Sequence, residues 1–131
     1  MDELPIRAGD DVVRVRQQVR AAAAEAGMSL IDQTKVVTAA SELARNTLVH
    51  GGGGAARIEQ VTNARGKPGI RVSFTDSGPG IPDVDLALTD GWTTGGGMGL
   101  GLSGARRLVD EFSLTTEAGA GTTVVMTKWA R

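Results

Sequence analysis

Two glycine-rich segments are the parts of this sequence whose residue types and spacing most clearly indicate chemistry. The first begins at Asp76 with D-S-G-P-G-I-P, and the second ends at Leu102 with G-G-G-M-G-L-G-L. Glycine allows close backbone approaches that a Cβ would block, and exposed N–H groups at a helix start bind anionic oxygens. The segments do not contain a P-loop, because no G-K-[S/T] is present. The segments therefore indicate a phosphate-bearing ligand bound in another way.

A carboxylate and an amide four residues apart form a second candidate for chemistry. Glu42 and Asn46 lie in a predicted helix over residues 30–49, and residues four apart share one face of a helix. This face lies roughly opposite the centre of the apolar stripe, so it points away from the core that the helix covers. The pair therefore belongs either to a solvated polar face or to one wall of a pocket.

The carboxylate of Asp76 is predicted at the end of the buried face of a strand. Ile70, Val72 and Phe74 alternate with polar residues, and the same alternation places Asp76 on the apolar side. A desolvated carboxylate without a hydrogen-bond donor would be costly. Asp76 therefore either accepts the N–H groups of the turn over residues 77–80 or takes a donor from a ligand.

Three helices are predicted to position these groups. Apolar residues at three- and four-residue spacing predict a first helix over residues 10–26, closed by Gly27. Ser29 is the expected N-cap of the second helix, which covers residues 30–49. The second glycine-rich segment opens directly into a third helix that begins at Gly99.

Strands are predicted before the first helix, between the second and third helices, and after the third helix. Four glycines at residues 51–54 end the second helix, a loop is expected over residues 81–92, and residues 93–98 are expected to form a mobile lid. Period-two alternation and turn signals predict an edge strand and two antiparallel hairpins. The expected strands are residues 4–6, 55–62, 70–76, 112–116 and 122–129.

Composition limits the class of protein. The 131 residues are enough for one domain, which we expect to span residues 1–131. A net charge of −1 without a basic stripe argues against nucleic acid as a partner. There is no cysteine and a single histidine, so a zinc site is not expected. No apolar run approaches the length of a membrane span, and we expect a soluble, cytoplasmic protein without a membrane partner.

The order of the motifs resembles that of the GHKL ATP-binding superfamily. The helix with Glu42 and Asn46 precedes a strand that ends in Asp76-x-Gly78-x-Gly80, and the second glycine-rich segment and a closing strand follow. The resemblance spans nearly the whole chain. It implies the Bergerat fold, an α/β two-layer sandwich of a mixed, mainly antiparallel sheet with three helices on one face, and ATP bound between the helix layer and the lid.

The resemblance also implies a role for each residue around the adenine. Asp76 would accept a hydrogen bond from the adenine amino group, which supplies the donor that this carboxylate needs. Gly78 and Gly80 would let the backbone pass close to the base, and Thr122 would support the adenine site through water.

At the phosphates, the resemblance assigns Asn46 as a ligand of Mg²⁺ and Glu42 as the general base. An amide oxygen is a suitable ligand for Mg²⁺, which commonly keeps several waters. Gly97, Gly99 and Gly101 would present N–H groups to the phosphate oxygens. The full set of residues placed at the nucleotide is Asn46, Asp76, Gly78, Gly80, Ile81, Gly97, Met98, Gly99, Leu100, Gly101, Leu102 and Thr122.

Within the superfamily, the chain resembles the RsbT-type switch kinases of the stressosome, which are small anti-sigma regulatory kinases. The likeness rests on S-E-L-A-R-N at residues 41–46, the short segment over residues 90–102, R-R-L-V-D-E-F at residues 106–112 and T-K-W at residues 127–129. It implies a serine/threonine kinase that phosphorylates STAS-domain partners and then activates a PP2C-type phosphatase, which leads to sigma-factor release.

Several features depart from this picture or keep alternatives open. No Lys or Arg occurs over residues 81–105, so slow turnover or weak ATP affinity is an expectation. Arg45 either supports the transition state or pairs with a carboxylate on its helix. His50 is expected to cap that helix, and Trp92 and Trp129 are expected to be packing residues. Two other functions remain open: a non-catalytic, nucleotide-dependent binding switch and an anti-sigma factor that sequesters a sigma subunit.

Overall fold

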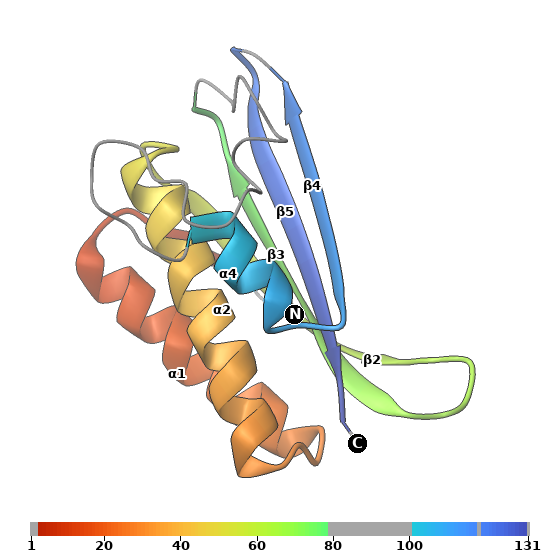
Figure 1. Cartoon of the computed structure of the whole chain (residues 1–131). Coiled ribbons are helices and arrows are strands. Elements are labelled where there is room, and N and C mark those ends of the chain that lie inside the picture. The colour runs from red at the N-terminus through yellow and green to blue at the C-terminus, as the bar shows by residue number, and fades with distance from the viewer. Residues whose placement is uncertain (1–2, 79–100, 118, 131) are drawn as a thin grey trace.

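The computed structural model of this protein describes residues 3–78, 101–117 and 119–130. These residues form a two-layer α/β sandwich in which the helices cover one face of a sheet (Figure 1). The expected two-layer architecture is confirmed. The elements are β1 (Glu3–Ile6), α1 (Gly9–Glu25), α2 (Leu30–Val49), β2 (Gly54–Thr62), β3 (Pro68–Asp76), α4 (Gly101–Arg107), β4 (Glu111–Glu117) and β5 (Gly121–Trp129).

The sheet has the strand order β1-β2-β3-β5-β4, and each described pairing is antiparallel. The register aligns Gly54 of β2, Asp76 of β3 and Thr122 of β5 in one row across three neighbouring strands. The row lies where β3 ends and β5 begins. The sheet therefore brings Asp76 and Thr122 of the closing strand side by side.

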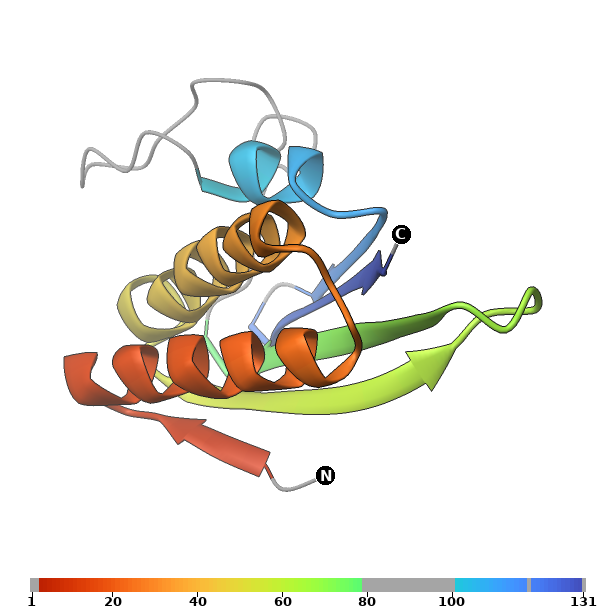
Figure 2. The same cartoon turned by 90° about the horizontal axis from the view of Figure 1, so that it is seen from below.

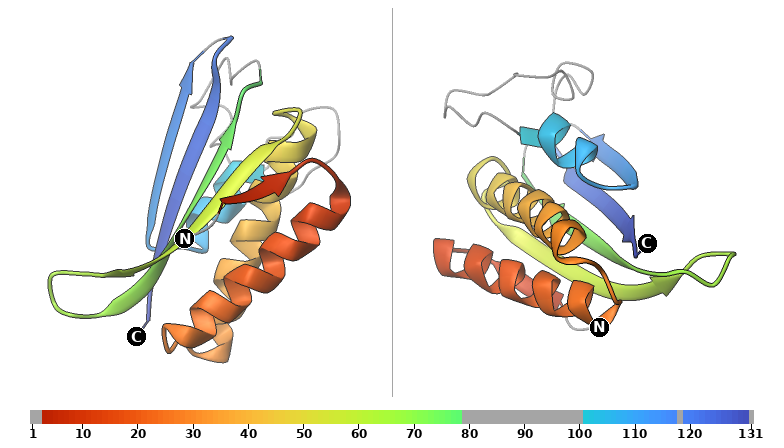
Figure 3. Two further views of the ribbon diagram at one scale, coloured as in Figure 1. Left: turned by 180° about the vertical axis from the view of Figure 1, so that it is seen from behind. Right: turned by 60° about the horizontal axis from the view of Figure 1, so that its bottom comes forward.

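Helix α2 is the central element of the helix layer. It lies between α1 and α4 on the same face of the sheet (Figures 2 and 3). Its apolar stripe packs onto the inward face of β3, where Ile70, Val72 and Phe74 are at most 1% exposed. The alternation predicted for this strand is therefore confirmed, and burial of these large side chains is the main force that holds α2 on the sheet.

A glycine and a serine side chain define the junction at which α1 ends and α2 begins. Gly27 follows α1 with φ +84°, and the N–H groups of Gly27 and Met28 donate to the carbonyls of Ala24 and Ala23 in the pattern of a Schellman motif. Ser29 caps α2, because its Oγ accepts the Asp32 N–H at 3.2 Å. The predicted C-terminal glycine and N-cap are both confirmed.

The β2–β3 turn is organised by Asn63, whose side chain accepts the N–H groups of Arg65 and Lys67.

The other differences between the predicted and the observed secondary structure lie mainly at the ends of elements. Helix α4 ends at Arg107, although helical spacing of apolar residues continues beyond it, because Asp110 N–H already donates to Thr127 of β5. The expected loop over residues 81–92, the lid over residues 93–98 and the predicted helix start at Gly99 lie outside the described residues.

Among the helices of the described ranges, none has the combination of length and apolarity that crossing a membrane requires.

Candidate nucleotide-binding site

The carboxylate of Asp76 lies at the end of β3 under the loop that follows α2. Gly51, two residues after the end of α2, packs directly onto this carboxylate, and a Cβ at Gly51 would collide with it. Gly78 approaches the same loop, because its own Cβ would lie 2.8 Å from the Gly51 carbonyl oxygen. Two segments distant in sequence, the loop after α2 and the turn after β3, therefore meet at Asp76, and each comes close to the other through a glycine.

The described residues donate to one of the two carboxylate oxygens of Asp76. Oδ1 accepts the Gly78 N–H at 2.9 Å, so the turn supplies one donor, as one of the two sequence-based alternatives predicts. Within residues 3–78, 101–117 and 119–130, no residue donates a hydrogen bond to Oδ2. Asp76 is half-buried, and an ionised carboxylate there can accept further donors. The turn therefore fixes the carboxylate and leaves acceptor capacity for a ligand.

Thr122 lies next to Asp76 in the neighbouring strand. The two residues are register partners in β3 and β5, and Thr122 is 9% exposed. The hydroxyl of Thr122 lies 3.0 Å from that of Thr116 on β4, so the position of its side chain is set by the strand beyond it. Sequence reasoning placed Thr122 at the nucleotide but did not find Thr116, because nothing local marks a cross-strand hydroxyl pair.

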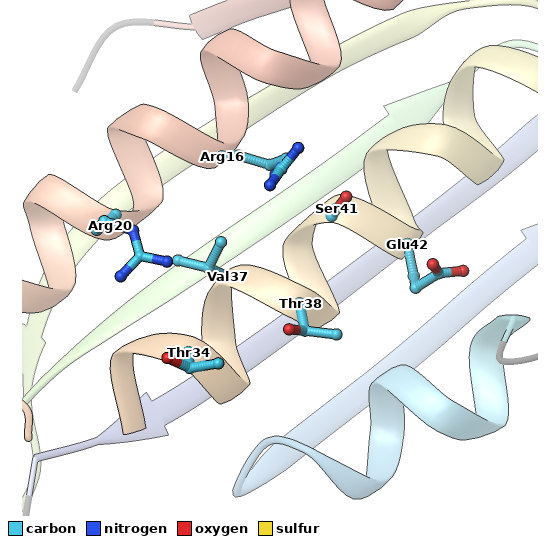
Figure 4. Close-up of a pocket in the computed structure, with 7 residues that line it drawn as sticks. All are labelled: Arg16, Arg20, Thr34, Val37, Thr38, Ser41 and Glu42. Carbon is cyan, nitrogen blue, oxygen red and sulfur yellow. The ribbon is translucent and has the colours of Figure 1, made fainter. Parts of the chain in front are cut away.

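Glu42 and Asn46 lie in the second half of α2, and both residues are partly buried. The Glu42 side chain is 13% exposed, so it does not belong to a freely solvated face. It points from α2 toward α4 (Figure 4). Of the two sequence-based interpretations, the structure favours the wall of a pocket for Glu42.

Arg45 pairs with the candidate base. Its Nη1 lies 3.3 Å from Glu42 Oε1, one turn away on the same helix, and the Arg45 side chain is 45% exposed. The carboxylate-pairing alternative for Arg45 is therefore confirmed. An exposed pair of this kind adds little stability, but it restrains the orientation of the Glu42 carboxylate.

The end of α2 connects Asn46 to Asp76. The carbonyl of Asn46 accepts the N–H groups of His50 at 2.9 Å and of Gly51 at 3.1 Å. His50 is the C-cap of α2, as expected. Gly51 in turn contacts the Asp76 carboxylate. The helix motif and the strand motif are therefore joined by two backbone hydrogen bonds and one glycine contact, and they lie at the same end of the molecule. Sequence reasoning described residues 51–54 only as the glycines that end the helix and missed this role of Gly51.

The start of α4 carries the part of the second glycine-rich segment that the structure describes. Gly101 is the first residue of α4, and Leu102 is 8% exposed and belongs to the hydrophobic core. The side chain of Leu102 therefore anchors α4 against α2. The other predicted nucleotide contacts lie outside the described residues: Gly80, Ile81, Gly97, Met98, Gly99 and Leu100.

Comparison with known proteins identifies the class. Residues 31–130 match the family of histidine kinase-, DNA gyrase B- and HSP90-like ATPases. The chain therefore belongs to this family, whose members share an ATP-binding domain, and it binds ATP.

A curated relative narrows the assignment. The chain is 48% identical over 121 residues to the serine/threonine-protein kinase RsbT of Bacillus subtilis strain 168. The aligned region covers 92% of this chain and 90% of the relative. Within the ATPase family, this chain is accordingly a serine/threonine-protein kinase similar to RsbT.

Two solved structures show the same fold. The crystal structure of the RsbU and RsbW domains of a Mycobacterium tuberculosis protein superposes with a TM-score of 0.64 and 24% identity, over 100% of this chain and 33% of that one. The histidine kinase domain of a blue-light activated kinase from Erythrobacter litoralis superposes with a TM-score of 0.53 and 20% identity, over 95% of this chain and 60% of that one. This chain thus corresponds to about a third of the first and three fifths of the second.

Proposed function

We propose that this kinase transfers the γ-phosphoryl group of ATP to a serine or threonine of a STAS-domain regulatory protein, and that it works as a partner-switching regulator. The observation that carries the proposal is the convergence of α2 and β3. The candidate base Glu42, the candidate metal ligand Asn46 and the candidate adenine acceptor Asp76 are held at one end of the molecule by Gly51.

Adenine recognition would rest on Asp76 and its glycine surroundings. The base has an exocyclic amino group that can donate to Oδ2, while Gly78 N–H holds Oδ1. The space over the carboxylate is bounded by backbone at Gly51 and Gly78, which allows a flat ring to approach closely. Thr122, beside Asp76, offers a hydroxyl to a water or a ring nitrogen.

The residues present fit Mg²⁺ as a companion of ATP and not as an independently bound metal. Within the described ranges, no group of three or more His, Cys, Asp or Glu could hold a metal ion. The Asn46 amide oxygen would be the protein ligand, and phosphate oxygens and waters would complete the shell, as Mg²⁺ prefers. When bound, Mg²⁺ supplies charge neutralisation at the phosphates.

Glu42 would act as the general base. It would accept the proton of the substrate hydroxyl as that oxygen forms its bond to the γ-phosphorus and the bond to the ADP oxygen breaks. The pairing with Arg45 at 3.3 Å orients the carboxylate. Because the sequence has no Lys or Arg over residues 81–105, we propose that turnover is slow.

The partner-switching part of the proposal is supported by the relatives. RsbT is a serine/threonine-protein kinase, and one structural neighbour contains RsbU and RsbW domains. We propose that phosphorylation releases this chain from the STAS-domain protein so that it can bind and activate a PP2C-type phosphatase. We further propose that residues 1–131 act as one domain in the cytoplasm.

The test is transfer of γ-³²P from ATP, with Mg²⁺, to a STAS-domain protein encoded beside this gene. We expect label on a serine or threonine, and Glu42→Gln should abolish transfer while ATP binding by calorimetry is retained. Unchanged transfer by the variant would remove Glu42 from the mechanism. Tight ATP-dependent association without label would instead indicate a nucleotide-dependent binding switch, and copurification with a sigma subunit would indicate an anti-sigma factor.

A further inference from the structure

A groove between α1 and α2 lies next to the candidate base. It has a volume of about 270 Å³ and is open on the outer side of the helix layer. Arg16 and Arg20 reach into it from α1, and Glu42 lines it on the side nearer α4 (Figure 4). The nucleotide-binding residues of β3 and β5 do not line it, so the groove is a separate surface that shares one residue with the proposed catalytic site.

The two arginines of the groove carry charge that no other described residue neutralises. Both are exposed, and within the described residues neither makes an ion pair or a side-chain hydrogen bond. Arg14, on the same helix, is different, because it pairs with Asp11 at 3.0 Å. Arg16 and Arg20 are four residues apart, so like charges repel at this spacing on a helix. An anionic partner would remove that cost.

The opposite wall of the groove supplies hydroxyl groups. Thr34, Thr38 and Ser41 follow one another along α2 at three- and four-residue spacing. The Thr34 hydroxyl already donates to the Leu30 carbonyl, which leaves its oxygen as an acceptor. A wall of hydroxyls opposite two guanidinium groups suits a polar peptide with carboxylates better than an apolar ligand.

The size and openness of the groove favour a protein segment over a metabolite. Pockets for small molecules are typically about 300–1,000 Å³ and enclose most of the ligand. This groove is smaller, and its arginines are exposed. It has room for one or two side chains of a segment that lies across α2, and it leads to Glu42, where a substrate hydroxyl is needed.

We propose that the α1–α2 groove docks an acidic segment of the protein substrate, with Arg16 and Arg20 binding carboxylates that lie near the phosphorylated serine or threonine. The proposal rests on the proposed kinase function with Glu42 as the base. It assigns substrate selection to two residues of α1 that contact neither ATP nor the reacting atoms.

The experiment compares two doubly substituted proteins with the same change in net charge. Arg16→Glu/Arg20→Glu reverses the groove, and Arg65→Glu/Lys67→Glu reverses two exposed residues of the β2–β3 turn, which lies away from the helices (Figure 1). Steady-state phosphorylation of the STAS-domain protein encoded beside this gene gives KM and kcat. Calorimetry gives the ATP affinity, and a direct binding assay gives the affinity for the unphosphorylated STAS-domain protein.

We expect the groove variant to raise KM for the protein substrate roughly tenfold or more, to retain kcat and ATP affinity, and to lose most of the salt dependence of kcat/KM. The turn variant should match the unmodified protein. Equal KM values for the two variants would overturn the proposal. If the unmodified protein transfers no phosphate, the proposal of STAS-domain phosphorylation fails. The binding assay then still decides whether Arg16 and Arg20 bind the STAS-domain protein. Equal binding by both variants would reject the groove as its docking site.

Discussion

One aspartate lies at each end of α2, Asp32 in its first turn and Asp76 of β3 beside the loop that follows it, and the two carboxylates have opposite surroundings. At the start of α2, Asp32 is 8% exposed and its Oδ1 lies 3.6 Å from Nζ of Lys128, which is 3% exposed on β5. At the end of α2, Asp76 of β3 is surrounded by glycine backbone and receives one N–H bond from its own turn. Among the residues that the structure describes, Asp32 has a cationic partner and Asp76 does not.

This difference separates a structural carboxylate from a binding carboxylate. A buried charge must be compensated. Lys128 compensates the charge of Asp32 within the fold. Next to it, the backbone N–H of Trp129 donates to Asp110 at 2.8 Å, and its indole Nε1–H donates to Glu111 at 2.9 Å. Side-chain interactions therefore surround this end of the sheet. At the other end, close backbone packing replaces side chains. Within residues 3–78, 101–117 and 119–130, Asp76 has one N–H donor and no cation, so its carboxylate can accept a further donor from a ligand.

The largest effect should come from Lys128→Met, which leaves Asp32 buried without its cation. We expect a loss of roughly 3 kcal/mol in the free energy of unfolding, since breaking a buried pair by removing one partner is strongly destabilising. Urea denaturation measures it.

The control for this prediction replaces both partners. Asp32→Leu/Lys128→Met should recover most of the lost stability, because no unpaired charge remains. ATP affinity should stay near that of the unmodified protein in both variants. If Lys128→Met unfolds at the same urea concentration as the unmodified protein, or loses ATP affinity while folded, Asp32 is not the structural carboxylate that we contrast with Asp76.

Asp76→Asn should produce the reverse pattern. The amide can present an N–H where the adenine amino group needs an acceptor, and a hydrogen bond to a charged group is worth roughly 1.5–3 kcal/mol. We expect ATP affinity by calorimetry to fall by at least roughly tenfold, with little change in the urea midpoint. Equal ATP affinity would mean that the adenine does not lie at Asp76.

Gly51→Ala tests whether the glycine surroundings hold the Asp76 carboxylate in place. The new Cβ would collide with that carboxylate, so Asp76 must move. We expect a roughly threefold loss of ATP affinity, smaller than that of Asp76→Asn because the acceptor itself remains. Gly9→Ala is the matched control, since a Cβ at Gly9 meets nothing within 4 Å. Similar affinities of the two alanine variants would show that Gly51 does not position Asp76.

The smallest effect concerns Asp11, a third aspartate that is satisfied by local backbone. The N–H of Arg7 at 2.8 Å lowers the pKa of Asp11 below its ordinary value of 3.8, with smaller contributions from the Ala8 N–H and Arg14. Its contribution to stability is therefore present above pH 3.8 and is lost as the pH falls through the lower pKa of the folded state. Thermal unfolding of Asp11→Asn should accordingly differ slightly from the unmodified protein near neutral pH and converge with it in acid. A constant difference at every pH would exclude this linkage.

The elements and the order of the motifs could be predicted because their signals are local. Gly27 and Ser29 mark the junction of α1 and α2 through turn and cap chemistry, which depends on neighbours within a few residues. The alternation of Ile70, Val72 and Phe74 predicted the buried face of β3. The order of the motifs, from Glu42 and Asn46 through Asp76 to the second glycine-rich segment and the closing strand, identified the ATP-binding family, which the comparisons confirm.

The sequence by itself thus determined the secondary structure, the two-layer class and the family. Tertiary structure alone decided which residues meet: Gly51 with Asp76, Thr116 with Thr122, Asp32 with Lys128, and the arginines of α1 with the hydroxyls of α2. The physical reason is that caps and alternation are properties of a few consecutive residues. Charge compensation and close packing depend on partners that the chain brings together only when the sheet register and the helix packing are complete.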